Sequence, residues 1–63
     1  MSRNIKTLAY FALPATADEV HASSLQFVRK LSGTARPSRA NEAAFDRAVE
    51  EVSASARRFI DSI

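Results

Sequence analysis

The first regular pattern along the chain is a stripe of apolar and small residues at helical spacing, which predicts an amphipathic helix beginning at Ala17. Polar residues occupy the positions between them, so we expect one side of this helix to face a core. The stripe consists of Val20, Ser24, Phe27, Val28 and Leu31.

Both ends of this helix carry recognisable signals. Thr16 and Glu19 have the spacing of a capping box, in which each side chain accepts a hydrogen bond from the other residue's backbone amide. At the other end, Arg29 and Lys30 favour the negative end of the helix dipole, and Gly33 can adopt the left-handed conformation that ends a helix. The sequence therefore predicts a helix between Thr16 and Gly33.

A second, longer pattern predicts a helix over residues 39–62, with Ser38 favoured over Asn41 as its N-cap. Its apolar positions recur in alternating steps of four and three residues, and the charged residues fall outside this seam. Ala48 and Ile60 widen the seam, which favours a globular bundle over an isolated rod. The seam consists of Phe45, Val49, Val52, Ala56, Phe59 and Ile63.

The connection between the two helices contains Gly33 and Pro37, so we expect an antiparallel helical hairpin. Residues 1–13 allow two interpretations. A short helix would place four apolar residues on one face: Ile5, Leu8, Ala9 and Ala12. A strand would instead be indicated by the alternating residues Ile5, Thr7, Ala9 and Phe11. We favour the helix, because a lone strand would leave its backbone groups unpaired.

The predicted fold is therefore an all-α, small helical domain over residues 1–63. It is an antiparallel helical hairpin with a short N-terminal helix packed across it.

Size and composition narrow what can support this fold. With 63 residues, 46% of them apolar, the chain suits one folded domain. Domains this small commonly need a disulfide, a metal or a partner chain. Cysteine is absent and His21 is the only histidine, so the sequence predicts no disulfide, no metal and no other cofactor. Helix packing or self-association is the support we expect.

The charge of the chain leaves nucleic-acid binding open, and its hydropathy argues against a membrane span. A formal net charge of +2 permits nucleic-acid binding without implying it. No apolar run approaches the roughly 18 residues of a membrane span, and residues 1–10 lack the apolar stretch of a secretion signal. We expect a cytoplasmic protein without membrane association.

Candidate catalytic groups are few. His21 lies on the predicted polar side of its helix, where a solvated histidine is the plainer interpretation. Asp46 and Glu50 could act as acid and base or bind a divalent cation, but paired acids on exposed helices are common. The sequence has no glycine-rich phosphate loop and no nucleophile in a recognisable arrangement with a histidine and an acid. No catalytic residue is therefore predicted.

A basic cluster around the helix connection carries the sharpest binding hypothesis. The amides at the start of the second helix could join its side chains in holding a phosphate. The alternative is that Arg29 and Lys30 complement a helix end while the other residues solubilise a loop. The candidate anion or nucleic-acid site comprises Arg29, Lys30, Arg36, Ser38 and Arg39.

The aromatic residues on the apolar faces, Phe27, Phe45 and Phe59, are expected in the core. Tyr10 and Phe11 fit either a core or an exposed contact surface. The full set of predicted core or interface residues is Phe27, Leu31, Phe45, Val49, Val52 and Phe59.

Four strings spread over nearly the whole chain resemble a known family. They are RNIKTL (3–8), PAT (14–16), LQFVRKLSG (25–33) and PSRANEAAF (37–45). In this order they are similar to the short bacterial proteins grouped as domain-of-unknown-function family 2277. The resemblance implies membership and no particular activity.

The resemblance also singles out polar residues within the matching strings. It adds Arg3, Asn4 and Asn41 to the functional candidates, although helix capping is an equal alternative for both asparagines. Family members commonly open with Met-Cys-Arg-Asn, whereas this chain has Ser2. A thiol-based role at that position cannot operate here.

The predicted function is a small helical protein–protein interaction module that self-associates through its apolar seam, as a homodimer or with another protein. The alternative is a nucleic-acid or phosphate-binding module that uses the basic helix connection. An enzyme ranks third, because it would need a cleft formed between chains.

Overall fold

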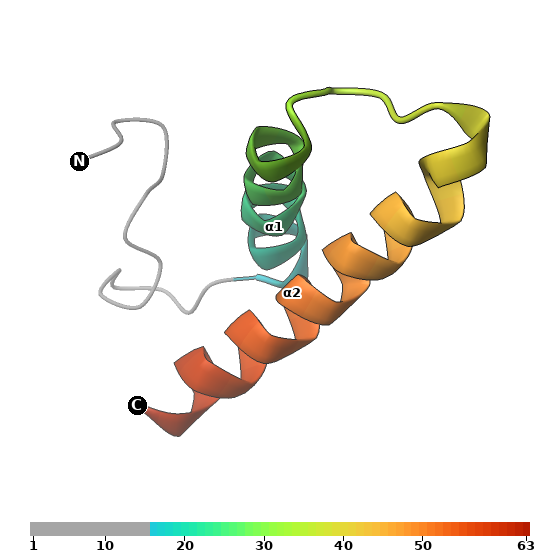
Figure 1. Ribbon diagram of the computed structural model, residues 1–63. Helices are drawn as coiled ribbons and strands as arrows, with labels where there is room; N and C mark the ends of the chain where they lie inside the picture. The colour runs from blue at the N-terminus through green and yellow to red at the C-terminus, as the bar shows by residue number, and fades with distance from the viewer. Residues whose placement is uncertain (1–15) are drawn as a thin grey trace.

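The structure is a computed structural model that describes residues 16–63. In this part of the chain the regular elements are α1 (Ala17–Ser32), the short 3-10 helix η1 (Arg39–Asn41) and α2 (Glu42–Ser62) (Figure 1). The predicted all-α class is confirmed. The predicted N-terminal helix within residues 1–13 lies outside the described residues.

The limits of α1 agree with the sequence signals. The Thr16 hydroxyl accepts a hydrogen bond from the Glu19 backbone N–H at 3.1 Å, and the Glu19 carboxylate accepts one from the Thr16 N–H at 2.9 Å. This reciprocal pair is a complete capping box. At the other end Gly33 has φ 72°, and its N–H donates to the Arg29 carbonyl at 2.9 Å. Both predicted ends of the first helix are confirmed.

The start of α2 differs from the prediction. Ser38 has the extended backbone of an N-cap, but its side chain makes no capping hydrogen bond. Instead, the Ser38 carbonyl accepts a hydrogen bond from the Asn41 N–H at 3.0 Å, which closes the 3-10 turn of η1. The α-helix proper begins only at Glu42, and Asn41 makes no side-chain cap either. A tight backbone turn here replaces the side-chain cap that the sequence suggested.

The two helices form the predicted antiparallel hairpin. The start of α1, with Ala17 and His21, shares a hollow with Ala54 and Arg57 in the second half of α2. The end of α1 instead shares a groove with the first turns of α2. Figure 1 shows α2 running back past α1 at an oblique angle, so the helices come together over a limited stretch and diverge beyond it.

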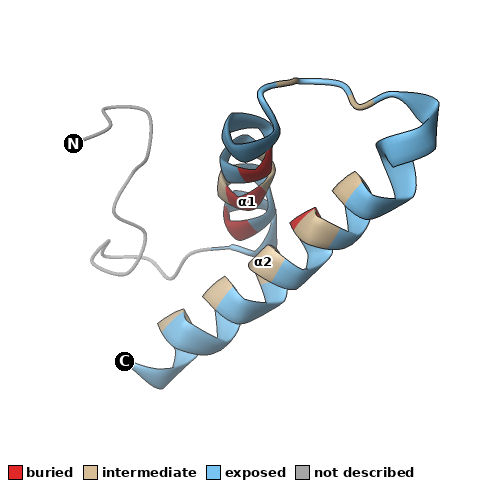
Figure 2. Cartoon of the chain, in the orientation of Figure 1, coloured by how far each residue is buried: buried red, intermediate tan, exposed pale blue. Residues whose placement is uncertain are grey.

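The buried residues lie where the helices cross (Figure 2). Val20 and Val28 of α1 and Val49 of α2 are only 3–4% exposed. Ser24 is equally buried, and its hydroxyl donates to the Val20 carbonyl at 2.8 Å. Among the described residues these four are the fully buried ones, a small core for a folded domain.

The prediction that Phe27 and Phe59 are core residues is wrong for the single chain. Phe27 is 44% exposed and Phe59 64% exposed, while Leu31 and Ile63 on the same stripes are 70% and 66% exposed. Helices that cross obliquely bury only the side chains near their crossing point, and stripe positions farther along lose the facing helix. Phe45 and Val52 are half-buried, and Val49 is buried as predicted.

Within residues 16–63, no helix combines the length and the apolar character that crossing a membrane requires.

Candidate functional site

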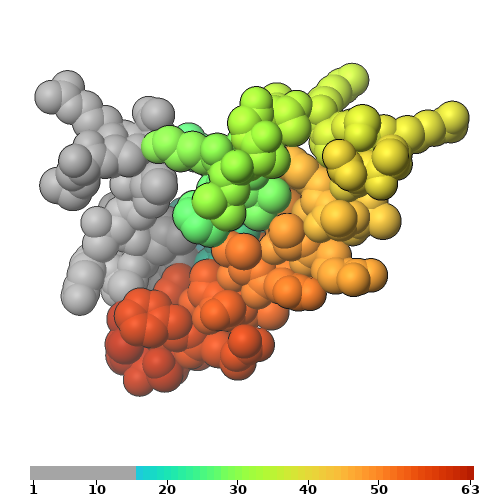
Figure 3. All heavy atoms as spheres, viewed as in Figure 1, coloured from blue at the N-terminus to red at the C-terminus, as the bar shows by residue number. Residues whose placement is uncertain are grey.

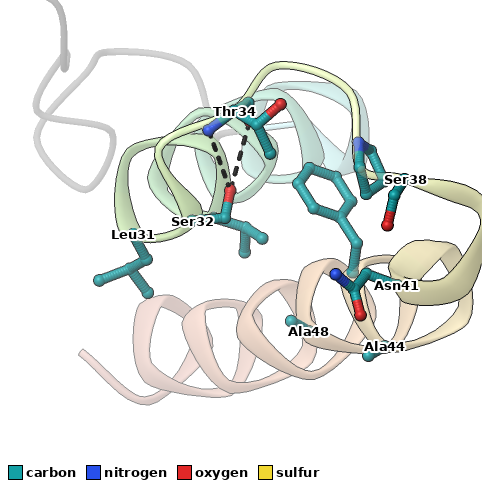
Figure 4. A pocket seen from close by; sticks show the side chains of 10 residues that line it. Leu31, Ser32, Thr34, Ser38, Asn41, Ala44 and Ala48 are labelled. Carbon is teal, nitrogen blue, oxygen red and sulfur yellow. Dashed lines mark hydrogen bonds between the residues drawn. The ribbon is translucent and has the colours of Figure 1, made fainter.

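A groove of about 400 Å³ opens between the end of α1, the connection and the first turns of α2 (Figure 4). In Figure 4, Leu31 and Ser32 line it from α1, and Ala44 and Ala48 line it from α2. Most of its surface is apolar. The remaining lining residues are Val28, Thr34, Pro37, Ser38, Asn41 and Phe45.

Hydrogen bonds within the connection shape one side of this groove. The Ser32 hydroxyl accepts from the Thr34 N–H at 3.4 Å and donates to the Thr34 carbonyl at 3.3 Å. The Thr34 hydroxyl in turn donates to the Arg36 carbonyl at 2.7 Å. These short-range bonds hold the chain in a wide turn, so the start of α2 is kept apart from the end of α1. The groove is therefore built into the local backbone.

The predicted anion-binding residues are all exposed, but the structure divides them among several surroundings. The Arg29 Nε donates to the Ala35 carbonyl at 3.3 Å, so this side chain braces the connection. Arg36 lines a shallow depression together with the carboxylates of Glu42 and Asp46, where charges of both signs meet.

The other members of that set are also placed apart. Ser38 lines the groove, while Lys30 and Arg39 line neither the groove nor the depression beside Arg36. The anion site stays a prediction that no contact in the described residues tests.

One contact between the helices was invisible to sequence analysis. His21 Nε2 of α1 lies 4.0 Å from Glu50 Oε1 of α2, with both side chains more than half exposed. The two residues line a hollow of about 400 Å³ with Asp18, Ser53 and Arg57. Only the tertiary pairing of the helices brings His21 to Glu50, so no local spacing could have revealed it.

This hollow brings a serine, a histidine and an acid together, but no hydrogen bond joins the serine to the histidine. The Ser53 hydroxyl oxygen is buried and has no hydrogen-bond partner, so neither His21 nor Glu50 activates it in this structure. Asp46, predicted as a possible partner of Glu50, lies four residues before it on α2 and lines the depression that contains Arg36. Among residues 16–63 no group of three or more His, Asp or Glu side chains is placed to hold a metal ion.

Of the three polar residues suggested by the family resemblance, one is among the described residues and two are not. Asn41 lines the groove next to Ser38. Arg3 and Asn4 lie outside the described residues.

Comparison with known proteins identifies relatives and no activity. The model of domain-of-unknown-function family 2277, described as an uncharacterized conserved protein, matches residues 1–63. No curated protein and no solved structure matches the chain.

Proposed function

We propose that this chain, which belongs to domain-of-unknown-function family 2277, is a cytoplasmic helical interaction module that associates with a second copy of itself. One observation carries the proposal. Four large apolar side chains, Phe27, Leu31, Phe59 and Ile63, are exposed, whereas the buried apolar residues of the described chain are three valines.

The sizes of the two groups favour association. Fully burying one apolar side chain is worth about 1.5–3 kcal/mol, so covering these four at an interface would add a contribution of the same order as that of the three buried valines. Large apolar side chains exposed at both ends of a small hairpin offer area that a partner can cover. A second copy would supply the cover without any further component.

The test is the solution mass measured by light scattering over a dilution series, with helix content followed by circular dichroism on the same samples. We expect a dimer at high concentration that dissociates on dilution and loses helix as it does so. A helical monomer at every concentration would contradict the proposal.

A pair of variants makes the test specific. Phe59→Ala removes an exposed aromatic ring from the surface proposed for association and should shift the midpoint of dissociation to higher concentration by roughly tenfold or more. Gln26→Ala truncates an exposed polar side chain of α1 and should leave the midpoint unchanged. Equal effects of the two changes would argue against the proposed surface.

A further inference from the structure

We propose a specific geometry for the pair: the two copies dock antiparallel, and the Phe59 and Ile63 side chains of each copy occupy the groove of the other. This inference rests on the self-association proposed above and defines which surfaces meet. The groove in question is the one lined by Leu31, Phe45 and Ala48.

The groove and the side chains that would fill it belong to opposite ends of one helix. Phe45 lies in the groove, and Phe59 lies fourteen residues farther along α2, which is about 21 Å at the rise of an α-helix. Figure 3 shows the beginning of α2, in yellow, and its end, in red, at opposite sides of the visible face. The end of α2 therefore cannot fold into the groove of its own chain, but the end of another copy can enter it.

The seam of α2 has the internal symmetry that an antiparallel pair requires. Phe45, Val52 and Phe59 are spaced seven residues apart, so Val52 lies midway between the two aromatic residues. When two such helices run antiparallel with Val52 near the two-fold axis, Phe45 faces Phe59 of the partner subunit at both ends. Val52 is half-buried in the single chain, which leaves part of it available for this contact.

Charge along α2 favours the antiparallel arrangement over the parallel one. The first ten residues of the helix carry four carboxylates and one arginine, whereas the remainder carries two arginines and one carboxylate. Antiparallel docking places the acidic half of each helix beside the basic half of the other, and parallel docking would place like beside like. In the described chain Arg58, Glu42 and Glu51 are without an ion pair, so these charges are available for the interface.

Reciprocal docking also closes the assembly. Each copy offers one groove and one apolar helix end, and a two-fold pair uses both from both copies. One-way docking would leave a free groove and a free helix end on every assembly, which would continue into filaments. In this arrangement each groove is filled by the helix end of the partner copy.

Cysteine cross-linking can test this geometry, because the natural chain has no cysteine. Ala44→Cys marks the groove and Ser62→Cys marks the end of α2, and both positions are exposed, so the variants should fold. The two variants are mixed, oxidised mildly and analysed by mass spectrometry without reductant. We expect the mixed 44–62 dimer in several-fold excess over the 44–44 and 62–62 dimers. Ala22→Cys, exposed on the polar face of α1, is the control and should form little cross-link with Ser62→Cys.

The outcomes separate this geometry from association itself. Light scattering that shows a dimer, together with 44–44 or 62–62 products or no cross-link at all, would overturn the antiparallel docking and leave self-association intact. Light scattering that shows only monomer would overturn both. Predominance of the mixed product supports the geometry.

Discussion

The helix crossing and the diverging ends of the hairpin are built from side chains of different size. At the crossing, Val20, Ser24 and Val49 are buried, and all three are small or β-branched. Away from it, Leu31 and Phe59 are larger and mostly exposed. The difference in size between the buried and the exposed side chains of the described residues is the observation on which we base the proposed self-association.

The small side chains have a physical role at the crossing. Small residues let two helices approach closely, and the Ser24 hydroxyl avoids an unpaired polar group by donating to the Val20 carbonyl of its own helix. Phe27 and Leu31 follow on the same stripe, where the oblique path of α2 leaves them uncovered. The same helix therefore serves an internal contact at its centre and an open surface at its end.

Val49→Asp should break the crossing and have the largest effect. Val49 is 4% exposed, and a carboxylate there would be buried without a partner at a cost of several kcal/mol, comparable to the whole stability of a small domain. We expect loss of the helical circular-dichroism signal. Glu51→Asp, two residues away and exposed, is the control that should remain helical. A folded Val49→Asp protein would show that the crossing is not the core.

Leu31→Ala should act on the diverging end and leave the crossing intact. Leu31 lines the groove and is mostly exposed, so its truncation costs the single chain little but removes contact area from a docked partner. We expect sedimentation equilibrium to show that the free energy of dissociation of the pair falls by about 1.5–3 kcal/mol. Helix content at high concentration should be unchanged. Lys30→Ala, its exposed neighbour, should change neither quantity. If Leu31→Ala lowered the unfolding free energy of the monomer by as much as it lowered the dissociation free energy, Leu31 would belong to the core of the single chain.

Gly33→Ala should cost about 1 kcal/mol of unfolding free energy, because an L-residue is disfavoured at positive φ. A Cβ at Gly33 would meet nothing within 4 Å, so backbone strain is the sole cause of the loss. Gly33→Asn should lower the unfolding free energy less than Gly33→Ala does, because asparagine tolerates a positive φ better than alanine. Urea denaturation of both variants measures the difference, and equal losses would contradict the assignment to strain.

Ser53→Ala should have the smallest effect, and it should stabilise the protein where the other substitutions destabilise it. We expect its unfolding free energy to rise by up to about 1 kcal/mol. Its hydroxyl oxygen is buried without a hydrogen-bond partner, so removing it abolishes a desolvation cost. Ser24→Ala is the matched control, because the Ser24 hydroxyl has a partner and its loss should bring no comparable gain. A fall in melting temperature on Ser53→Ala would mean that this hydroxyl is satisfied in solution.

The local signals predicted the first helix better than the second. At the start of α1, Thr16 and Glu19 each bond to the other's backbone, so their spacing in the sequence was sufficient evidence. At the start of α2, Ser38 and Asn41 both resembled caps, but a 3-10 turn satisfied the backbone without either side chain. The difference between these two solutions is a small change in backbone geometry that residue types do not specify.

The sequence by itself determined the all-α class, both ends of α1, the antiparallel hairpin and membership of the family, because these depend on spacing within short segments. Only the tertiary structure decided which residues of each apolar stripe are buried, why Phe59 and Leu31 are exposed, and that His21 meets Glu50. Helical periodicity identifies the face that a helix presents, but burial also depends on where along that face the other helix crosses. That crossing point is set by the packing of whole helices and the path of the connection, which no local pattern encodes.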